Sequence, residues 1–168
     1  MKNPLKKVII FTDGGCEPNP GRGGYGIVII YMNHRKELSD GYRLTTNNRM
    51  ELLAAIKGLE SLNQPCKVNL FSDSEYVVNA FKKGWFKRWK ARNWHRQNNK
   101  MVANYDLWIL LDSLVQKHQV DFKWVKSHNN IPENDRCHEL AMHALKSNGL
   151  MIDEFFESLP ESDPKEIQ

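Results

Sequence analysis

The chain has 168 residues, a formal net charge of +4 at neutral pH and 40% hydrophobic residues, which suits one domain with a sizeable core. No run of 18 apolar residues occurs, and the polar start at residues 1–7 lacks the apolar region of a signal peptide, so neither a membrane span nor export is expected. Three widely spaced cysteines, Cys16, Cys66 and Cys137, fit reduced thiols better than a disulfide framework or a zinc site. These features predict a cytoplasmic protein.

Three strand-like runs come first in the chain. Residues 8–11 are β-branched or aromatic and lead into Asp13, residues 24–31 form a second run, and residues 37–44 form a weaker third one. We expect these runs to pair as an antiparallel meander. We also expect Asp13 to end the first strand.

The segment Gly21–Gly26 satisfies the G-x-G-x-x-G pattern of dinucleotide-binding sites. In such a site a helix follows the glycines, so that its N-terminus meets the pyrophosphate. Here a strand-like run follows instead. We therefore reject nucleotide binding and interpret these glycines as turn residues.

After residue 50 the hydrophobic period becomes that of helices alternating with strands. We predict helices at 52–62, 74–81, 104–118 and 132–147, and strands at 68–71 and 120–125. This order predicts an α/β fold in which helices cover a mixed sheet, as one domain over residues 1–150. The remaining segment, residues 151–168, is acidic, carries two prolines and is predicted to be a poorly ordered tail.

Basic charge is concentrated in residues 82–100, which hold eight Lys or Arg and no acid, against 16 basic and 20 acidic side chains elsewhere. A local excess of this kind indicates contact with a polyanion, and a nucleic acid backbone is the natural candidate. Trp85, Trp89 and Trp94 are interleaved with the cations. We expect the tryptophans to form a small aromatic core beneath an exposed basic face.

Three acids stand at the ends of predicted elements: Asp13 and Asp73 follow strands, and Glu51 opens the first long helix. Each has a local explanation, since Asp13 precedes two glycines, and Asn48-x-x-Glu51 and Ser72-x-x-Glu75 both match capping boxes. Together they point to chemistry, because ligands of α/β sheets gather at the carboxyl ends of strands. Clustered carboxylates repel one another, and a divalent cation such as Mg²⁺ removes that penalty.

Several motifs, in order over roughly residues 7–147, make this chain similar to type 1 ribonuclease H of the bacterial kind. The most specific of them is Thr45-Thr-Asn-Asn-Arg-Met-Glu51-Leu. The others are Ile10-Phe-Thr-Asp13-Gly14, Asn19-Pro-Gly21, Gly23-Gly-Tyr-Gly26, Ser72-Asp73-Ser74, Asp106-Leu-Trp108, Trp124-Val-Lys126-x-His128 and Pro132-Glu-Asn134-x-Arg136-Cys137-x-Glu139-Leu-Ala141.

The resemblance implies a ribonuclease H-like fold whose five-stranded mixed sheet has three antiparallel strands followed by two parallel ones. It implies an endonuclease that cuts the RNA strand of RNA–DNA hybrids with Mg²⁺, or Mn²⁺ as a substitute, giving 3′-hydroxyl and 5′-phosphate ends. Asp13, Glu51 and Asp73 match the metal ligands, and Glu51 also lies where the family contacts the RNA 2′-hydroxyl. His128 matches a mobile histidine that assists proton transfer or product departure; its alternative is an exposed loop histidine.

The chain departs from the family pattern at His138, where a fourth aspartate is usual. Helical geometry places His138 at the border of the buried stripe and Asp135 about 60° further towards solvent, so we expect His138, and not Asp135, to face the site. Imidazole suits Mg²⁺ poorly, and our hypothesis is that His138 holds one metal weakly or through water. The alternative is a passive surface substitution.

The resemblance also implies how the hybrid is held. The basic segment 82–100 matches a protrusion that grips the DNA strand. Asn19, Asn47 and Asn48 match hybrid-contacting amides, and Thr46 matches a residue of the DNA phosphate pocket; local turn and cap bonds are their alternative roles. Glu75 stands where the family often has an amide. From the exposed cations we expect Lys87, Arg88, Lys90 and Arg92 to contact the hybrid.

Two rival functions remain open at this point. One is a non-catalytic hybrid-binding module disabled by His138, which predicts no metal-dependent turnover. The other is a related nuclease of the same fold, such as a junction resolvase or transposase core, which would cleave duplex DNA. No feature of the sequence indicates an oligomer, and we expect a monomer.

Overall fold

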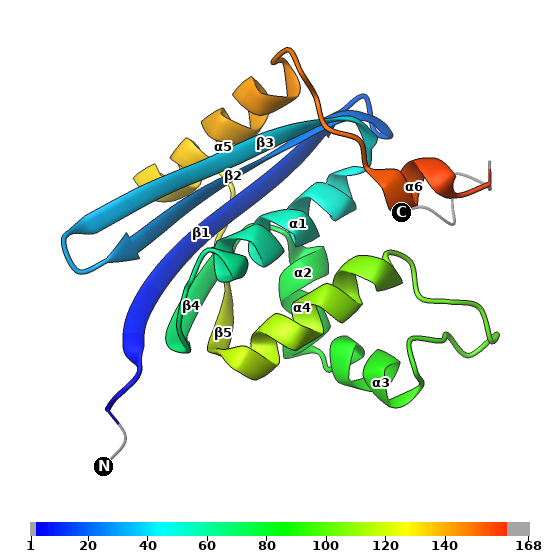
Figure 1. Cartoon of the computed structure of the whole chain (residues 1–168), viewed down its shortest axis with the longest axis horizontal. Coiled ribbons are helices and arrows are strands. Elements are labelled where there is room, and N and C mark those ends of the chain that lie inside the picture. Colours follow the sequence, from blue (N-terminus) through cyan, green and yellow to red (C-terminus); the bar gives the residue numbers. More distant parts are fainter. Residues whose placement is uncertain (1–2, 161–168) are drawn as a thin grey trace.

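Five strands form a sheet in the order β3-β2-β1-β4-β5 in the computed structural model, which describes residues 3–160 (Figure 1). The strands are β1 (Lys6–Glu17), β2 (Gly21–Tyr31), β3 (His34–Thr45), β4 (Cys66–Ser72) and β5 (Gln119–Trp124). The first three pair antiparallel, whereas β4 pairs parallel with β1, and β5 pairs parallel with β4. The predicted α/β fold with a five-stranded mixed sheet is therefore confirmed.

The first two strands extend further than the apolar runs that predict them. β1 continues through Asp13 to Glu17, so Asp13 lies inside the strand and does not end it. β2 begins at Gly21, so the interpretation of the glycine-rich run as turn residues is wrong. The antiparallel register pairs Asp13 with Gly26. Hydrogen bonds between the two strands pair the backbone N–H and C=O groups, so residues of low intrinsic strand propensity also become strand.

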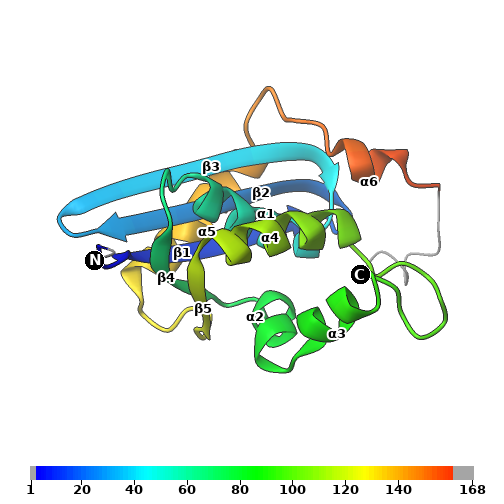
Figure 2. The same cartoon turned by 60° about the horizontal axis from the view of Figure 1, so that its bottom comes forward.

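Helices cover both faces of this sheet. They are α1 (Asn47–Glu60), α2 (Glu75–Lys82), α3 (Trp85–Ala91), α4 (Tyr105–Lys117), α5 (Pro132–Leu145) and α6 (Glu154–Ser158). Helix α1 packs on β1 and β2 and is backed by α4, while α5 packs across β1, β2 and β3 on the other face (Figures 1 and 2). The sheet is thus the middle layer of three.

Successive side chains of the central strands point to opposite faces of the sheet, so the buried side chains are divided between the two faces. Ile10 and Ile27 belong to the large core under α1 and α4, and both are fully buried. Their neighbours Phe11 and Val28 face the other way and pack with Cys137 of α5 in a smaller cluster. Both faces of β1 and β2 are therefore apolar, which fixes the strand positions that carry Asp13.

The tryptophans of the basic segment join the main core. Trp94 is buried with its ring 5.4 Å from that of Phe86, and the Trp89 ring lies 5.3 Å from that of Trp108, which is fully buried on α4. The predicted aromatic core is confirmed, and it is continuous with the core of the domain. This packing anchors α3 to the body of the protein.

The C-terminal segment differs from the predicted poorly ordered tail over residues 151–160. Met151 exchanges backbone hydrogen bonds with Gly41 and Arg43, and α6 follows directly. Asp153 is buried, and its carboxylate is paired with the guanidinium of Arg49 and accepts a hydrogen bond from the Thr45 hydroxyl. The prediction was based on acidic composition and is wrong here, because a carboxylate that is paired with a cation can be buried in an ordered segment. Residues 161–168 of the predicted tail lie outside the described residues.

The two predicted capping boxes are not formed. The N-cap of α1 is Thr46, whose hydroxyl accepts from the Arg49 N–H, and the N-cap of α2 is Ser74, whose hydroxyl accepts from the Val77 N–H. Glu51 therefore lies beyond the cap positions of α1 and is free of that local role.

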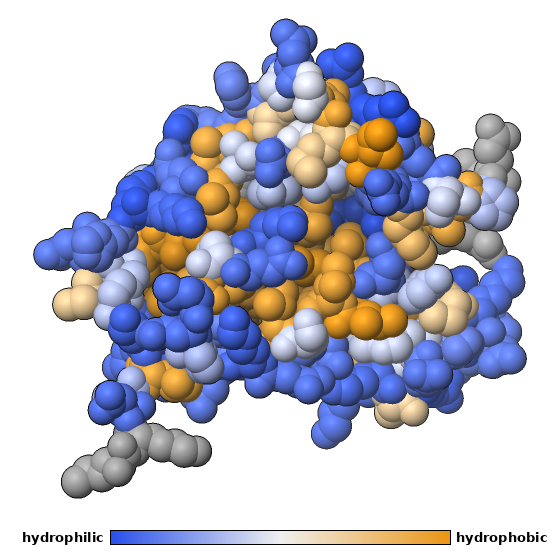
Figure 3. All heavy atoms as spheres, in the orientation of Figure 1, coloured by the Kyte–Doolittle hydropathy of each residue, from blue (hydrophilic) through white to orange (hydrophobic). Residues whose placement is uncertain are grey.

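The surface is hydrophilic around its outline and has apolar side chains in the middle of the face that carries α1 and α4 (Figure 3). Within residues 3–160 no helix has the length and apolar character needed to cross a membrane.

Candidate active site

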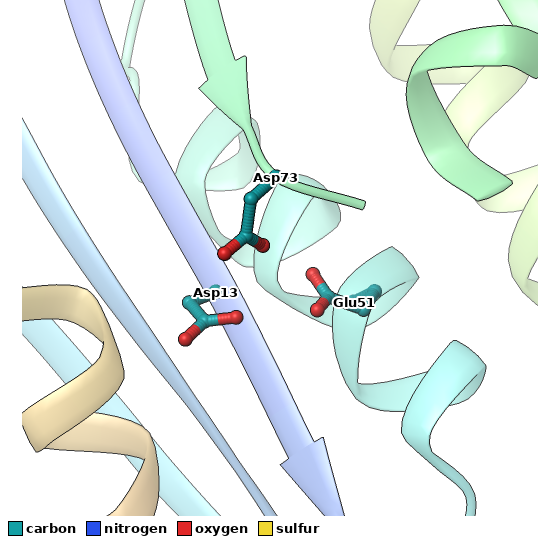
Figure 4. A group of neighbouring side chains, drawn as sticks. All are labelled: Asp13, Glu51 and Asp73. Carbon is teal, nitrogen blue, oxygen red and sulfur yellow. The ribbon is translucent and has the colours of Figure 1, made fainter. Parts of the chain in front are cut away.

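Sheet register brings Asp13 and Asp73 together. The parallel ladder between β1 and β4 ends at the pair Thr12–Ser72, so the next residue of each chain segment is an aspartate at the same edge of the sheet. Glu51 comes from α1, which crosses beneath that edge. The three side chains point toward one another in Figure 4, as the sequence predicts.

Two glycines let the helices approach the strands at this point. A Cβ on Gly14 would lie 2.4 Å from the backbone nitrogen of Glu51, and a Cβ on Gly26 would lie 2.0 Å from the carbonyl oxygen of Cys137. Only glycine allows the backbones of α1 and α5 to come this close to β1 and β2. Glu51 and His138 are thereby placed on either side of Asp13.

The carboxylates of Asp13, Glu51 and Asp73 form a tight group. One oxygen from each lies within 4.8 Å of the others. Asp13 and Glu51 are 5% and 4% exposed, so two of the three charges are removed from bulk water. Asp13 Oδ1 accepts from the Gly14 N–H at 2.9 Å, and Asp73 Oδ2 accepts from the Ser127 hydroxyl at 2.7 Å, but Oε2 of Glu51 is buried and has no hydrogen-bond partner.

Burial and mutual repulsion both favour protonation of Asp13 and Glu51. Burial, followed by the charge of Asp73, raises the pKa of Asp13 to about 6, although hydrogen bonds with His138 and Glu51 oppose the shift. Burial, followed by the charges of Asp13 and Asp73, raises the pKa of Glu51 well above its ordinary value. Shifts of this kind and cause are typical of functional sites.

Two histidines border the acids. His138 Nδ1 lies 2.9 Å from Asp13 Oδ2, and the tautomer protonated at Nδ1 donates a hydrogen bond to that carboxylate. His128 has a left-handed backbone (φ 55°) in the exposed loop before α5, and its ring meets that of His138 edge-on at 5.8 Å between centroids. The predicted orientation of His138 towards the site is confirmed, but His138 is not among the residues whose ligand atoms lie within 4.8 Å of one another.

These side chains line a cavity of about 340 Å³. Asn47, Ser127, Asn134 and Asp135 also line it. The prediction that His138 and not Asp135 faces the site is therefore wrong for Asp135, because the cavity reaches the first turn of α5 as well as the loop before it. Sequence reasoning missed Ser127 and Asn134, although Ser127 precedes His128 and Asn134 lies inside a quoted motif. Asn134 is buried, and its side-chain oxygen has no hydrogen-bond partner.

The predicted hybrid-contacting residues near α1 form one local group. The side chain of Asn19 accepts from the Asn47 N–H at 3.1 Å, and Asn48 is half-buried beside it. Thr46 is 1% exposed and its hydroxyl caps the helix, so its local role is present. Glu75 is exposed at the start of α2, next to Asp73 but not in the cavity.

The predicted cations Lys87, Arg88, Lys90 and Arg92 are all exposed on or directly after α3. Lys90 forms an ion pair with Asp112 of α4 at 2.9 Å, so part of its charge is already compensated. Arg88 and Arg92 line a groove of about 510 Å³ together with Arg96 and the half-buried Trp89. The basic segment thus offers a cationic groove that is separate from the acidic cavity.

Sequence reasoning also missed the role of Arg49. This residue is 2% exposed, and its guanidinium donates to both carboxylate oxygens of Asp106 and of Asp153. Arg49 stands two residues before Glu51, inside the most specific motif of the sequence. Its place in that motif was the available signal.

Comparison with known proteins agrees with this arrangement. The family model described as RNase H matches residues 5–146. Ribonuclease H of Syntrophus aciditrophicus (strain SB) is 55% identical over 152 residues, which cover 90% of this chain and 88% of that protein.

Two solved structures share the fold. LC9-RNase H1, described as a type 1 RNase H with the type 2 active-site motif, superposes with a TM-score of 0.76 at 24% identity and covers 95% of this chain and 84% of its own. LC11-RNase H1, solved in complex with an RNA/DNA hybrid, has a TM-score of 0.64 at 24% identity, with 82% and 96% coverage. With its acids, its fold and its relatives in agreement, the chain belongs to the RNase H family.

Proposed function

We propose that Asp13, Glu51 and Asp73 hold the divalent metal ions with which this ribonuclease H hydrolyses the RNA strand of RNA–DNA hybrids, leaving 3′-hydroxyl and 5′-phosphate ends. One observation carries the assignment: three carboxylates, two of them buried, present oxygens within 4.8 Å of one another. The reaction is inferred from membership of the family, and its location in the protein is inferred from the group of acids.

The acids fit a hard cation. Oε2 of Glu51 is buried without a hydrogen-bond partner, which is costly unless a positive group completes it. Burial, and after it mutual repulsion, raises the pKa values of Asp13 and Glu51, and a bound cation would relieve that repulsion. Carboxylate oxygens suit Mg²⁺ and Mn²⁺, and such ions supply a Lewis acid at the scissile phosphate and lower the pKa of water.

The chain's own groups have distinct parts in this proposal. Glu51 accepts the RNA 2′-hydroxyl, which distinguishes RNA from DNA at the cut. Ser127 keeps the Asp73 carboxylate oriented through its 2.7 Å hydrogen bond. His128, exposed where it lines the cavity, takes or returns a proton at the product oxygen.

His138 has an indirect part. Its Nδ1 faces Asp13, and its side chain is 48% exposed. We propose that His138 orients the Asp13 carboxylate and holds a metal weakly or through water, because imidazole is a softer ligand than the carboxylate that the family usually has there.

The basic protrusion, residues 82–100, grips the DNA strand in this proposal. Lys87, Arg88, Lys90 and Arg92 contact phosphates, while Asn19, Thr46, Asn47, Asn48 and Glu75 contact the hybrid nearer the acids. Phosphate contacts carry no base information, so little sequence preference is expected. A monomeric, cytoplasmic enzyme remains the prediction.

The test is incubation of end-labelled hybrid, duplex RNA and duplex DNA with Mg²⁺ or Mn²⁺. Wild type should cleave only the RNA of the hybrid, and Asp13→Asn should reduce the rate by at least about 10²-fold. Hybrid binding without metal-dependent turnover would support a non-catalytic module, and cleavage of duplex DNA would support a resolvase-like enzyme. His138→Asp is assayed beside them. Activity that appears only in this variant would mean that His138 disables the wild-type site, whereas activity in both proteins would mean that His138 only alters it.

A further inference from the structure

A buried ion cluster joins the C-terminal segment to the helix that carries Glu51. The guanidinium of Arg49 is held on one side by Asp106 of α4, at 2.8 and 2.9 Å, and on the other by Asp153, at 2.7 and 2.9 Å. The side chain of Arg49 is 3% exposed and that of Asp153 is 9% exposed. The ring of Phe155 covers the guanidinium at 5.1 Å.

Asp153 touches three elements at once. Oδ2 accepts from the hydroxyl of Thr45, the last residue of β3, at 2.7 Å, as well as from Arg49 of α1. Oδ1 accepts from the Phe156 N–H and so caps α6. Asp153 therefore spans the junction between β3 and α1, where Thr46 lies between the two elements and Asn47 and Asn48 are the first residues of α1.

The opposite side of α1 has no room for adjustment. The backbone at Met50 and Glu51 presses on Gly14, next to Asp13. The first turn of α1 is thus held between β1 on one side and the Arg49 cluster on the other. A small rotation of this turn would move the Glu51 oxygens relative to Asp13 and Asp73.

The charge of the cluster favours this positioning role. Burial alone would lower the pKa of Arg49, but the hydrogen bonds that Arg49 donates to Asp106 and Asp153 outweigh it, and the pKa is raised above its ordinary value. One carboxylate would already neutralise the guanidinium. The second one adds direction, because two bidentate carboxylates fix the plane of the fork.

We infer that Asp153 is a positioning residue for the active site: through Thr45 and Arg49 it holds the β3–α1 junction so that Glu51 meets Asp13 and Asp73, and Asn47 and Asn48 face the hybrid. The inference rests on the proposed function of those residues. It gives the segment 151–158, which follows the matched family region, an indirect part in catalysis.

The test compares Asp153→Asn with Glu157→Gln. Asparagine keeps the shape and the helix cap but leaves Arg49 a single charged partner. Glu157→Gln breaks the exposed ion pair with Arg43 that also ties α6 to the domain, yet Glu157 has no bond to Arg49. Steady-state cleavage of the hybrid and calorimetric titration with Mg²⁺ are measured at 25 °C, where circular dichroism confirms that each variant is folded.

Asp153→Asn should lower kcat/KM by at least about tenfold and weaken Mg²⁺ binding several-fold, since displacements near 1 Å at a reacting site have effects of this size. Glu157→Gln should stay within about twofold of wild type. Equal activity and equal Mg²⁺ affinity in folded Asp153→Asn would overturn the inference while wild-type cleavage leaves the proposed function intact. An inactive wild type would instead defeat the proposed function.

Hydrogen exchange on the wild type provides a measurement that needs no variant. The Met50 N–H, bonded to the Thr46 carbonyl, should open together with the Glu157 N–H, bonded to the Asp153 carbonyl. Opening of α6 at lower free energy with no loss of protection at Met50 would contradict the inference. Arg49→Lys is the second variant, and it should lose activity like Asp153→Asn because an ammonium lacks the planar fork.

Discussion

His138 Nδ1 lies 2.9 Å from Oδ2 of Asp13, so an imidazole touches one carboxylate of the acidic group. In the metal-free protein this contact lowers repulsion in two ways. It supplies a hydrogen-bond donor to Asp13, and it replaces what would be another negative charge. We therefore expect the metal-free site to be more stable with histidine than with aspartate at position 138.

The first prediction is that His138→Asp destabilises the metal-free protein by about 1 kcal/mol, a figure discounted for the half-exposed side chain. This corresponds to a fall in Tm of roughly 2–4 °C for a domain of this size. Calorimetry in EDTA measures it. The variant should also have a lower ratio of Mn²⁺ to Mg²⁺ activity than wild type, because aspartate is the harder ligand. A higher Tm for the variant would be the contrary outcome, and equal ratios would reject any contact of His138 with metal.

The second prediction concerns pH. The folded pKa of Asp13, about 6, lies above its ordinary value of 3.8, so the folded state binds the proton more tightly than the unfolded state. The contribution of Asp13 to metal-free stability is complete below pH 4 and is lost as pH rises through 6. Relative to Asp13→Asn, the wild type should lose on the order of 2–3 kcal/mol of unfolding free energy between pH 4 and pH 7.

Urea unfolding in EDTA at four pH values tests this, and a pH-independent difference between the two proteins would refute it. Saturating Mg²⁺ should reduce the loss for the wild type but not for Asp13→Asn, because the cation binds the deprotonated carboxylate.

The third prediction separates the cations of the protrusion. Replacing Lys87, Arg88 and Arg92 together by alanine should raise KM for the hybrid and make the salt dependence of binding shallower by about 2–3 in log–log slope. Lys90→Ala should change the slope less than Lys87→Ala, because Lys90 is already paired with Asp112. Fluorescence anisotropy over a salt series measures both. An unchanged slope in the triple variant would mean that these residues do not contact phosphate.

The fourth prediction concerns Gly14. Gly14→Ala places a methyl group 2.4 Å from the Glu51 nitrogen, which α1 can relieve only by moving away from β1. We expect a loss of about 1–3 kcal/mol in stability and at least about a tenfold loss in activity. The matched control is Gly58→Ala in α1. A Cβ at Gly58 would have as its nearest neighbour a side-chain methyl of Ile10, at 3.1 Å. Chemical denaturation and hybrid cleavage compare the two, and a fully active Gly14→Ala would contradict the close-approach explanation.

The order of the five strands and of α1, α2, α4 and α5 could be read from the sequence because hydrophobic period is a local property, whereas the short helices α3 and α6 were not among the predicted elements. The boundaries could not, since Asp13 and the Gly21–Gly26 run become strand only through pairing between β1 and β2. Likewise the geometry of an isolated helix turns Asp135 towards solvent, but Asp135 lines the same cavity as Ser127 and His128.

By itself the sequence determined the three carboxylates, the basic segment and the alternation of elements, because residue chemistry and spacing are written along the chain. Only the tertiary structure decided that Asp13 and Asp73 share a sheet edge, that His138 bonds to Asp13, and that Asp153 holds Arg49. The physical reason is distance along the chain: Arg49 and Asp153 are 104 residues apart, and His138 and Asp13 are 125 apart. Contacts between residues so far apart in the chain depend on how the helices pack on the sheet, and a local sequence pattern carries no information about that packing.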